Sequence, residues 1–339
     1  MTTVSAGLLA FVVALVGVRV VEIVSRARNV LDQPVSRSSH TVATPTLGGI
    51  GIVLGTWAAA ATGNLTDTQL SILVAGTAVA VVGAIDDLRS LAPAVRLALQ
   101  LAISLAFAVR LEPALTLALP WGPATVSGPA AIALTTTVLV GIVNVWNFMD
   151  GLDGLAGGTT VVVALGLLAA GAPAIGLIGV AGATLGFLVW NHHPASIFMG
   201  DAGSTFLGFV LAASALSAGD AAGPATFGFV ALPFVLDAGV TLVRRGVARK
   251  PLLTAHREHH YQRLADAGVD HRSVAALYVG ASALSAVAAE SYIAGDVVAR
   301  FAVILAVAIA WVAYMASVRW AERRPRSADR VLRSRVEGA

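Results

Sequence analysis

Acidic side chains stand at the ends of long apolar segments in this sequence. The stretch NVWNFMDGLDGLAGG (144–158) places Asp150 and Asp153 three residues apart directly after an apolar run, and GAIDDLRS places Asp86 and Asp87 at the end of another. A charge at membrane depth is costly, so an ionisable residue there usually has a function or a partner. For any single pair, solvation at a helix end is an equally good interpretation.

Further polar residues gather in two other connectors. WNHHPASIFMGDAGST holds Asn191 and Asp201, and LTAHREHHYQRL holds His256, His259 and His260. Carboxylate and water ligands select Mg²⁺ or Mn²⁺, and Mg²⁺ normally bridges carboxylates to substrate phosphates. Basic residues around such a cluster attract a polyanion. Together these residue types indicate phosphoryl transfer at a membrane surface, where a metal and cationic groups stabilise charge on the transferring phosphate.

Other polar positions have simpler interpretations. The Gly-rich DGLDGLAGG lacks the Lys-Ser/Thr and the preceding strand of a phosphate loop, so that assignment fails. His192 and His193 are expected to be structural or interfacial. Asp237 lies inside the apolar run LPFVLDAGVTLVRR, about two helical turns from Arg244 and Arg245, and we expect it to have a partner rather than a catalytic role.

Composition indicates which elements must position these residues. Hydrophobic residues make up 57% of the 339 and charged residues 12%, whereas an ordinary soluble domain carries roughly 25% charged residues. Apolar segments of about 20 residues recur along the chain, each long enough to cross ~30 Å of hydrocarbon as a helix. Backbone groups in lipid must be satisfied within the segment. We therefore predict an all-α, polytopic integral membrane protein of about eleven transmembrane helices. The absence of cysteine excludes disulfides.

The basic residues indicate the orientation of the spans. The predicted spans are 4–25, 46–63, 69–86, 93–111, 130–149, 158–172, 174–191, 204–218, 225–244, 274–294 and 299–318. Arg-rich connectors alternate with connectors that have almost no basic residues, such as EPALTLALPWGPATVSG, which we expect to form a small external hairpin. The positive-inside rule places the Arg-rich set, with the polar clusters, in the cytoplasm. We expect an external N-terminus, one transmembrane catalytic domain over 1–318, and a basic cytoplasmic tail over 319–339.

Six motifs in one order resemble those of the polyprenyl-phosphate N-acetylhexosamine-1-phosphate transferases (glycosyltransferase family 4), which are related to the phospho-MurNAc-pentapeptide translocase. The motifs are LDQPVSRSSHTVATPTLGG, GAIDDLRSL, NVWNFMDGLDGLAGG, NHHPASIFMGDAGSTFLG, LPFVLDAGVTLVRR and PLLTAHREHHYQRL. In that family a lipid phosphate attacks the β-phosphate of a UDP-sugar, UMP leaves, and a polyprenyl-diphosphate sugar remains in the bilayer. The resemblance implies a bacterial inner-membrane enzyme that initiates synthesis of a cell-envelope polysaccharide, such as the O-antigen of lipopolysaccharide.

The resemblance also implies roles for the matching residues. Asp201 would hold Mg²⁺ (or Mn²⁺), and Asp86 and Asp87 would lie at the reacting phosphates, one deprotonating the lipid phosphate and the other, Asp87, supporting the metal. His259 would be the third catalytic group. The implied substrate-binding residues are Asp32, Arg37 and His40 in the first cytoplasmic loop; Asn147, Asp150 and Asp153 around the nucleotide and diphosphate; Asn191 and Phe198, whose ring would stack on uracil; and His256 and Arg257 in the last loop.

The last loop departs from the family pattern. Many relatives have His-x-His-His there, whereas this chain has HREHHYQ, which resembles the branch using N-acetylfucosamine or N-acetylquinovosamine nucleotides. Which histidine acts is therefore open. We expect a UDP-N-acetylhexosamine donor, with UDP-N-acetylglucosamine ahead of a 6-deoxy sugar, and undecaprenyl phosphate as acceptor. The expected surroundings are membrane lipid, with no nucleic acid, and a homodimer is left open.

Three alternatives remain. A transporter of an anionic solute also keeps acids in the membrane, but its sites usually lie at the bilayer midplane on broken helices. A phosphatidyltransferase acting on CDP-alcohols is Mg²⁺-dependent too, but its long Asp-Gly-x-x-Ala-Arg signature is absent. The phospho-MurNAc-pentapeptide translocase itself shares the motifs and differs in its donor.

The Arg asymmetry predicts the topology. A reporter fused after Ala339 should lie in the cytoplasm, and one inserted near Gly122 should be external. Activity of paired reporters that work on only one side of the membrane checks both positions. A cytoplasmic Gly122 would contradict the orientation and would move the acids to the wrong compartment.

Overall fold

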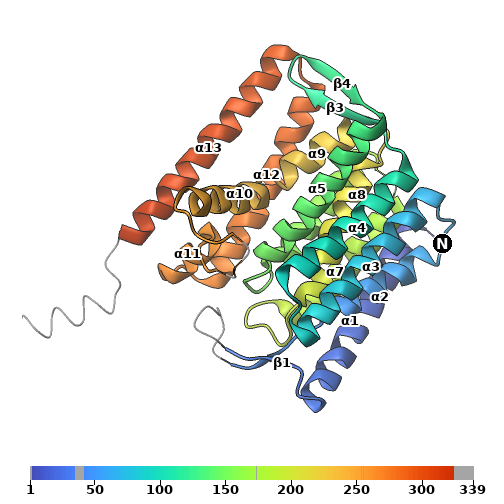
Figure 1. Ribbon diagram of the computed structural model, residues 1–339, viewed down its shortest axis with the longest axis vertical. Helices are drawn as coiled ribbons and strands as arrows, with labels where there is room; N and C mark the ends of the chain where they lie inside the picture. The colour runs from blue at the N-terminus through green and yellow to red at the C-terminus, as the bar shows by residue number, and fades with distance from the viewer. Residues whose placement is uncertain (1, 35–41, 173, 253, 255, 324–339) are drawn as a thin grey trace, which may run out of the picture.

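Helices make up nearly all the regular structure in the computed structural model, which describes residues 2–34, 42–172, 174–252, 254 and 256–323 (Figure 1). The helices are α1 (Thr3–Ala27), α2 (Gly49–Ala60), α3 (Asp67–Arg89), α4 (Pro93–Leu111), α5 (Gly128–Met149), α6 (Leu155–Ala169), α7 (Ala174–Asn191), α8 (Gly200–Leu216), α9 (Ala222–Val230), α10 (Leu232–Val247), α11 (His260–Asp266), α12 (His271–Ala294) and α13 (Val297–Arg323). The all-α prediction is confirmed.

Within this described part, six helices (α1, α3, α4, α5, α12 and α13) are long and apolar enough to cross a membrane. Helices α9 and α10 together pass the same test as one span bent by 62°, and four shorter apolar helices (α2, α6, α7 and α8) accompany them. Each predicted span falls on one of these helices or on the bent pair. Pro233 in the first turn of α10 explains the bend, because its ring clashes with the carbonyl four residues earlier. The chain is a multi-pass membrane protein.

Helix α8 is the centre of the bundle. Every residue from Ala202 to Ala215 is buried, and α8 packs against α3, α5, α2 and α9. Small residues allow this packing. A Cβ built on Gly49 of α2 would lie 2.2 Å from the Cα of Gly203 in α8, so the two backbones approach too closely for any larger residue.

Outer helices divide their surfaces between protein and lipid. In α1 the buried positions include three alanines at helical spacing (Ala6, Ala10 and Ala14), and the opposite face carries Val4 and Leu8, which are exposed. Helix α13, running along one side of Figure 1, is exposed along most of its length. Exposed aliphatic faces of this kind suit contact with acyl chains.

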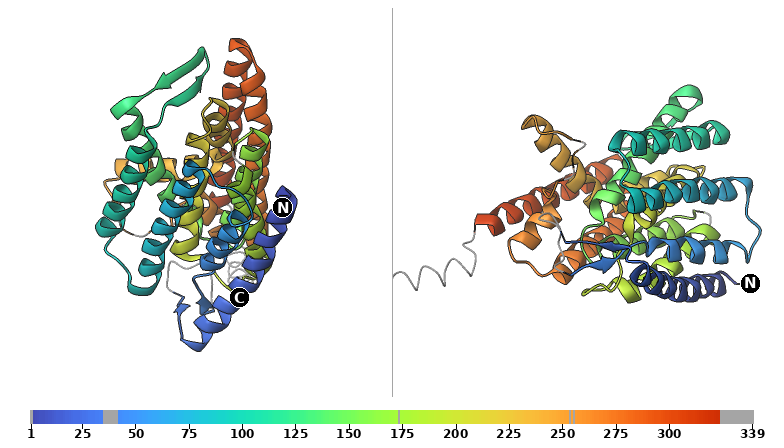
Figure 2. Two further views of the ribbon diagram at one scale, coloured as in Figure 1. Left: turned by 90° about the vertical axis from the view of Figure 1, so that its right-hand side faces the viewer. Right: turned by 60° about the horizontal axis from the view of Figure 1, so that its bottom comes forward.

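Short strands mark the two ends of the bundle. Strands β3 (Leu115–Leu119) and β4 (Gly122–Val126) form the predicted antiparallel hairpin. Strands β1 (Leu31–Asp32) and β2 (Thr44–Pro45) pair at the opposite end, as Figures 1 and 2 show. The connectors that carry the predicted site residues, including those before α8 and between α5 and α6, gather at the end with β1 and β2.

Candidate active site

Arg96 of α4 joins two of the predicted acids. One of its guanidinium nitrogens, Nη1, lies 2.6 Å from Asp86 Oδ2 and 2.7 Å from Asp201 Oδ2. Asp86 also accepts the backbone N–H of Leu91 at 2.6 Å. The ends of α3, α4 and α8 are thus tied together by one cation that two carboxylates share.

Asp87 caps the beginning of α8. Its carboxylate accepts the backbone N–H groups of Asp201 at 3.0 Å and Ala202 at 3.2 Å. These N–H groups have no partner within the helix, and the positive end of the helix dipole favours the carboxylate. Gly200 must remain glycine, because its φ is +73° and a Cβ there would lie 2.6 Å from Asp87 Oδ2.

Asn147 and Asp150 extend the acid cluster from the end of α5. Asn147 donates to the Ser204 hydroxyl at 3.3 Å and also hydrogen-bonds Asp201. Asp150 follows the last residue of α5. Burial, and then the charges of Asp201, Asp87 and Asp153, raise the pKa of Asp150 to about 8. The described cluster holds more negative charge than Arg96 neutralises, which is the setting for a further cation.

Asp153 points to a different set of partners. Its Oδ2 lies 2.7 Å from His193 Nδ1 and accepts the Ala195 N–H at 3.1 Å. Asn191, which is buried, accepts the Gly154 N–H at 2.9 Å and donates to the Ile197 carbonyl at 3.0 Å. These bonds join the α5–α6 and α7–α8 connectors, so Asn191 shapes the wall of the site through its own hydrogen bonds.

Phe198 stands between that wall and the first loop. Its backbone N–H donates to the Pro45 carbonyl at 2.8 Å, and its carbonyl accepts the Gly48 N–H at 2.9 Å. Its ring is half-buried. Asp32 in β1 is close enough to Asp87 for their charges to interact. Arg37 and His40 lie outside the described residues.

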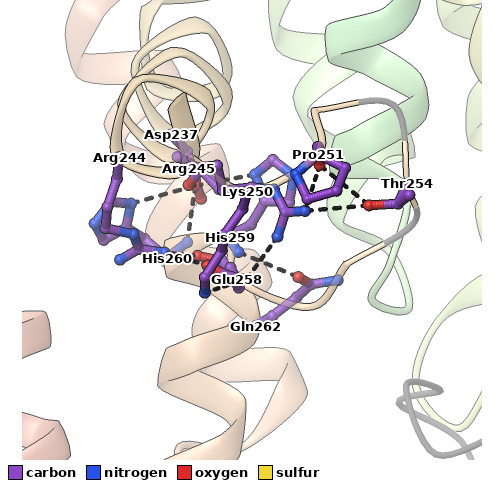
Figure 3. Close-up of polar contacts among 11 residues, drawn as sticks. Asp237, Arg244, Arg245, Lys250, Pro251, Thr254, Glu258, His259, His260 and Gln262 are labelled. Carbon is purple, nitrogen blue, oxygen red and sulfur yellow. Dashed lines mark hydrogen bonds and ion pairs between the residues drawn. The ribbon is translucent and has the colours of Figure 1, made fainter. Parts of the chain in front are cut away.

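The histidine segment, residues 256–261, is anchored on Asp237. This fully buried carboxylate accepts the N–H groups of His260 at 2.8 Å and Tyr261 at 3.1 Å, together with the hydroxyl of Tyr278. Figure 3 shows Asp237 beside His259 and His260. The Nδ1 atoms of His259 and His260 lie 3.4 and 3.3 Å from Asp237 Oδ1. The expectation that Asp237 has a partner is confirmed. The partners named here lie in this segment and in α12, and they are not Arg244 or Arg245.

A second ionic network holds the start of the segment. The buried Arg245 contacts Glu258 Oε1 at 2.5 Å and donates to the Pro251 carbonyl at 2.6 Å, and Lys250 Nζ lies 3.0 Å from the same Glu258 oxygen (Figure 3). The hydrogen bond from Lys250 holds the pKa of Glu258 below its usual value. Arg244 donates to the Glu258 carbonyl.

Ring contacts bring this segment against the end of α5. His259 stacks on His256 at 4.9 Å between ring centroids and lies 5.9 Å from Phe148. The Tyr261 hydroxyl donates to the Phe148 carbonyl at 2.9 Å, two residues before Asp150. Burial, together with the charges of His259 and Arg245, lowers the pKa of His256 to about 4, so its imidazole is neutral near pH 7. Arg257 pairs with Asp266 at 2.8 Å.

The structure adds residues that the sequence interpretation left out. Arg96 was placed inside the fourth predicted span, although a lone cation one turn into an apolar helix is itself a signal of a buried partner. The pairing of His193 with Asp153 had no sequence signal, because the two residues are 40 positions apart.

Known proteins show which family this architecture belongs to. Residues 69–219 match the model of the family described as Glycosyl transferase family 4. A probable undecaprenyl-phosphate N-acetylglucosaminyl 1-phosphate transferase of Bacillus subtilis is 32% identical over 299 residues, covering 80% of each chain. A decaprenyl-phosphate N-acetylglucosaminephosphotransferase of Mycobacterium tuberculosis is 31% identical over 305 residues, 75% of this chain and 74% of that protein.

A relative whose name gives a different transferase activity also matches this chain. A phospho-N-acetylmuramoyl-pentapeptide-transferase of Thermosynechococcus vestitus is 36% identical over 231 residues, 60% of this chain and 61% of that protein. The fold and the site define a multi-pass membrane protein with an acid-rich site at one end of its bundle. The chain belongs to glycosyl transferase family 4, which confirms the resemblance.

Asp237 should be essential for stability. In Asp237→Asn the amide cannot accept all the N–H and O–H donors now on the carboxylate, and each buried donor left unpaired costs about 1–3 kcal/mol. We expect a lower thermal midpoint in detergent micelles. Asp220→Asn is the matched control, because exposed Asp220 accepts the N–H groups of Ala222 and Gly223 at the start of α9 and Asn caps helices equally well. Equal midpoints for the two variants would contradict the anchoring role.

Proposed function

We propose that this chain transfers N-acetylhexosamine-1-phosphate from a UDP-sugar to undecaprenyl phosphate and releases UMP. The observation that carries the proposal is the gathering of Asp86, Asp87, Asp150 and Asp201, two of which share the guanidinium of Arg96, beside the histidine segment. The names of the family members given above include two polyprenyl-phosphate N-acetylglucosamine-phosphate transferases, which supports this acceptor and this sugar class.

The reaction exchanges one phosphoanhydride for another. An oxygen of the lipid phosphate forms a bond to the β-phosphorus of the UDP-sugar, and the bond from that phosphorus to the oxygen bridging to the α-phosphorus breaks. UMP leaves with the electron pair. Negative charge accumulates on the β-phosphate in the transition state, and catalysis depends on cationic groups that stabilise it there.

The acids of the site fit a magnesium ion. Asp86 and Asp201 already share one positive nitrogen of Arg96, and Asp150 adds an oxygen donor without a cation of its own. Carboxylate oxygens are the ligands that Mg²⁺ prefers. We assign the ion chiefly to Asp201 with support from Asp87; when bound it would neutralise charge on the two phosphates of the donor.

The remaining roles follow from burial and charge. Asp86, which lies in the last turn of α3 and is partly exposed, is our candidate for the base that deprotonates the lipid phosphate. His259 is 2% exposed and its ring lies behind His256, so we assign the phosphate contact to His256 and the support of that ring to His259. Neutral His256 can donate one hydrogen bond, while Arg257 supplies charge.

A double-label assay tests the reaction. Membranes containing the chain receive undecaprenyl phosphate and UDP-N-acetylglucosamine labelled in the β-phosphate or in the uracil. We expect the β-phosphate label to enter the organic-soluble lipid and the uracil label to be recovered as UMP. Recovery of both labels in UDP, with transfer of the sugar alone, would contradict phosphosugar transfer.

The same assay addresses the donor. We expect UDP-N-acetylglucosamine to be used ahead of a 6-deoxy donor such as UDP-N-acetylfucosamine. A strong preference for UDP-MurNAc-pentapeptide would contradict both and favour the pentapeptide transferases.

The acids should be required for turnover. Asp201→Asn should lower transfer by roughly 10²–10³ or more, because an amide is a poor substitute for the carboxylate that holds the metal and Arg96. Asp86→Asn and Asp87→Asn should be similarly impaired. Asp67→Asn, an exposed acid in the first turn of the same helix as Asp86, is the control and should retain activity. Normal turnover of Asp201→Asn at ordinary Mg²⁺ concentration would contradict the assignment.

A further inference from the structure

A second group of metal-binding side chains lies beside the acid cluster. Asp153, His193 and His271, which we name the Asp153 cluster, each offer one ligand atom, and these atoms all lie within 4.8 Å of one another. They come from three segments: the α5–α6 connector, the α7–α8 connector and the start of α12. All three residues are half-buried.

The imidazoles of this cluster are held in place. His193 Nδ1 lies 2.7 Å from Asp153 Oδ2, and the two histidine rings are 5.0 Å apart between centroids. Arg272 fixes the backbone of His193 by donating to its carbonyl at 3.2 and 2.6 Å. Nδ1 of His271 is buried and has no hydrogen-bond partner in the described structure. A buried ring nitrogen without a partner, next to a second imidazole and a carboxylate, is a ligand position.

The electrostatic balance favours a cation. Asp153 carries the negative charge, and Asp270 adds another close to His271. The nearby cations have their own partners, because Arg272 is bound to the His193 carbonyl and Arg257 to Asp266. A metal ion bound by two neutral imidazoles and one carboxylate would therefore meet net negative charge.

We propose that the Asp153 cluster binds a transition-metal ion of the zinc class. Two imidazole nitrogens and one carboxylate oxygen are ligands that suit Zn²⁺, Co²⁺ or Ni²⁺, whereas Mg²⁺ selects oxygen alone. Zinc ligands lie about 2.0–2.2 Å from the metal, so small side-chain rotations must bring the three atoms closer together. Three protein ligands leave the fourth coordination position open for water or another ligand.

A metal ion bound at the Asp153 cluster would inhibit the transferase reaction. The link rests on the proposed function and on the nucleotide-binding role that the family resemblance implies for Asp153. A bound zinc ion takes the Asp153 carboxylate, so the metal and the UDP-sugar compete for one side chain.

Metal uptake tests the site without any substrate. The full-length chain, purified with a histidine-free tag and stripped of metals, is titrated with Co²⁺ in millimolar Mg²⁺, which fills oxygen-only sites. We expect saturable binding of one Co²⁺ per chain, with the visible absorption of four- or five-coordinate cobalt, and displacement by Zn²⁺. The loss of one ligand should weaken binding by more than the roughly 10–100-fold that loss of an outer-shell partner costs.

Matched histidine variants decide the assignment. His193→Gln and His271→Gln should both lose the cobalt spectrum. His192→Gln should keep it, because exposed His192 is adjacent in sequence but its Nδ1 contacts the Val189 carbonyl. His256→Gln should keep it too, which excludes the histidine segment. No saturable uptake by the wild type, unchanged affinity in His193→Gln or His271→Gln, or an equal loss in His192→Gln would overturn the site.

The competition is measured separately. Zn²⁺ should inhibit transfer at saturating Mg²⁺, higher UDP-sugar should relieve the inhibition, and His271→Gln should be resistant with its basal rate unchanged. If the chain binds cobalt but zinc does not inhibit transfer, the proposed competition is wrong and the metal site still stands. A chain that binds cobalt but transfers no phosphosugar would overturn the proposed function and leave the metal site standing.

Discussion

The site depends on one contact, in which the carboxylate of Asp87 accepts the first free N–H groups of α8. Helix α8 is buried from Ala202 to Ala215, and the carboxylate at the positive end of its dipole satisfies N–H groups that have no partner within the helix. Fixing the start of α8 fixes Asp201, and Arg96 then joins Asp201 to Asp86. Gly200 and the close approach of Gly49 to Gly203 are consequences of the same constraint, because any larger residue would hold the helices apart.

The histidine segment is positioned by the same kind of interaction, a carboxylate that accepts the first N–H groups of a helix. Asp237, which is fully buried, accepts the N–H groups at the start of α11, as the partly buried Asp87 does at the start of α8. The hydrogen bond from Tyr261 to the Phe148 carbonyl then places the segment against the end of α5. Two carboxylates, each at a helix N-terminus, thus position the acid-rich half and the histidine-rich half of the candidate site. Their desolvation is offset by backbone and hydroxyl donors that have no alternative partner.

The acidic and basic side chains of the candidate site lie in separate halves, the acid cluster and the histidine segment. Asp86 and Asp201 share one guanidinium, and burial raises the pKa of Asp150, so this half accommodates additional positive charge. The basic side chains of the other half are mostly engaged with Glu258 and Asp266, and His256 is neutral. A diphosphate that arrives with a divalent cation would therefore satisfy the acids through the metal. The Asp153 cluster differs in its donors, since it offers two imidazoles where the main cluster offers only oxygen.

The sequence by itself determined the class of fold and located the acids that gather in the candidate site. Apolar segments of spanning length can only be helices in lipid, and each predicted segment falls on a helix. Acids and histidines at segment ends, in a fixed order, were sufficient to indicate the family and the acid cluster. The tertiary structure decided which groups are partners: Arg96 with Asp86 and Asp201, His193 with Asp153, and Asp237 with the histidine segment rather than with Arg244 and Arg245. The physical reason is that periodicity fixes only local faces, whereas these pairs depend on how distant helices cross. Those crossings are set by small residues whose close approach a linear pattern does not specify.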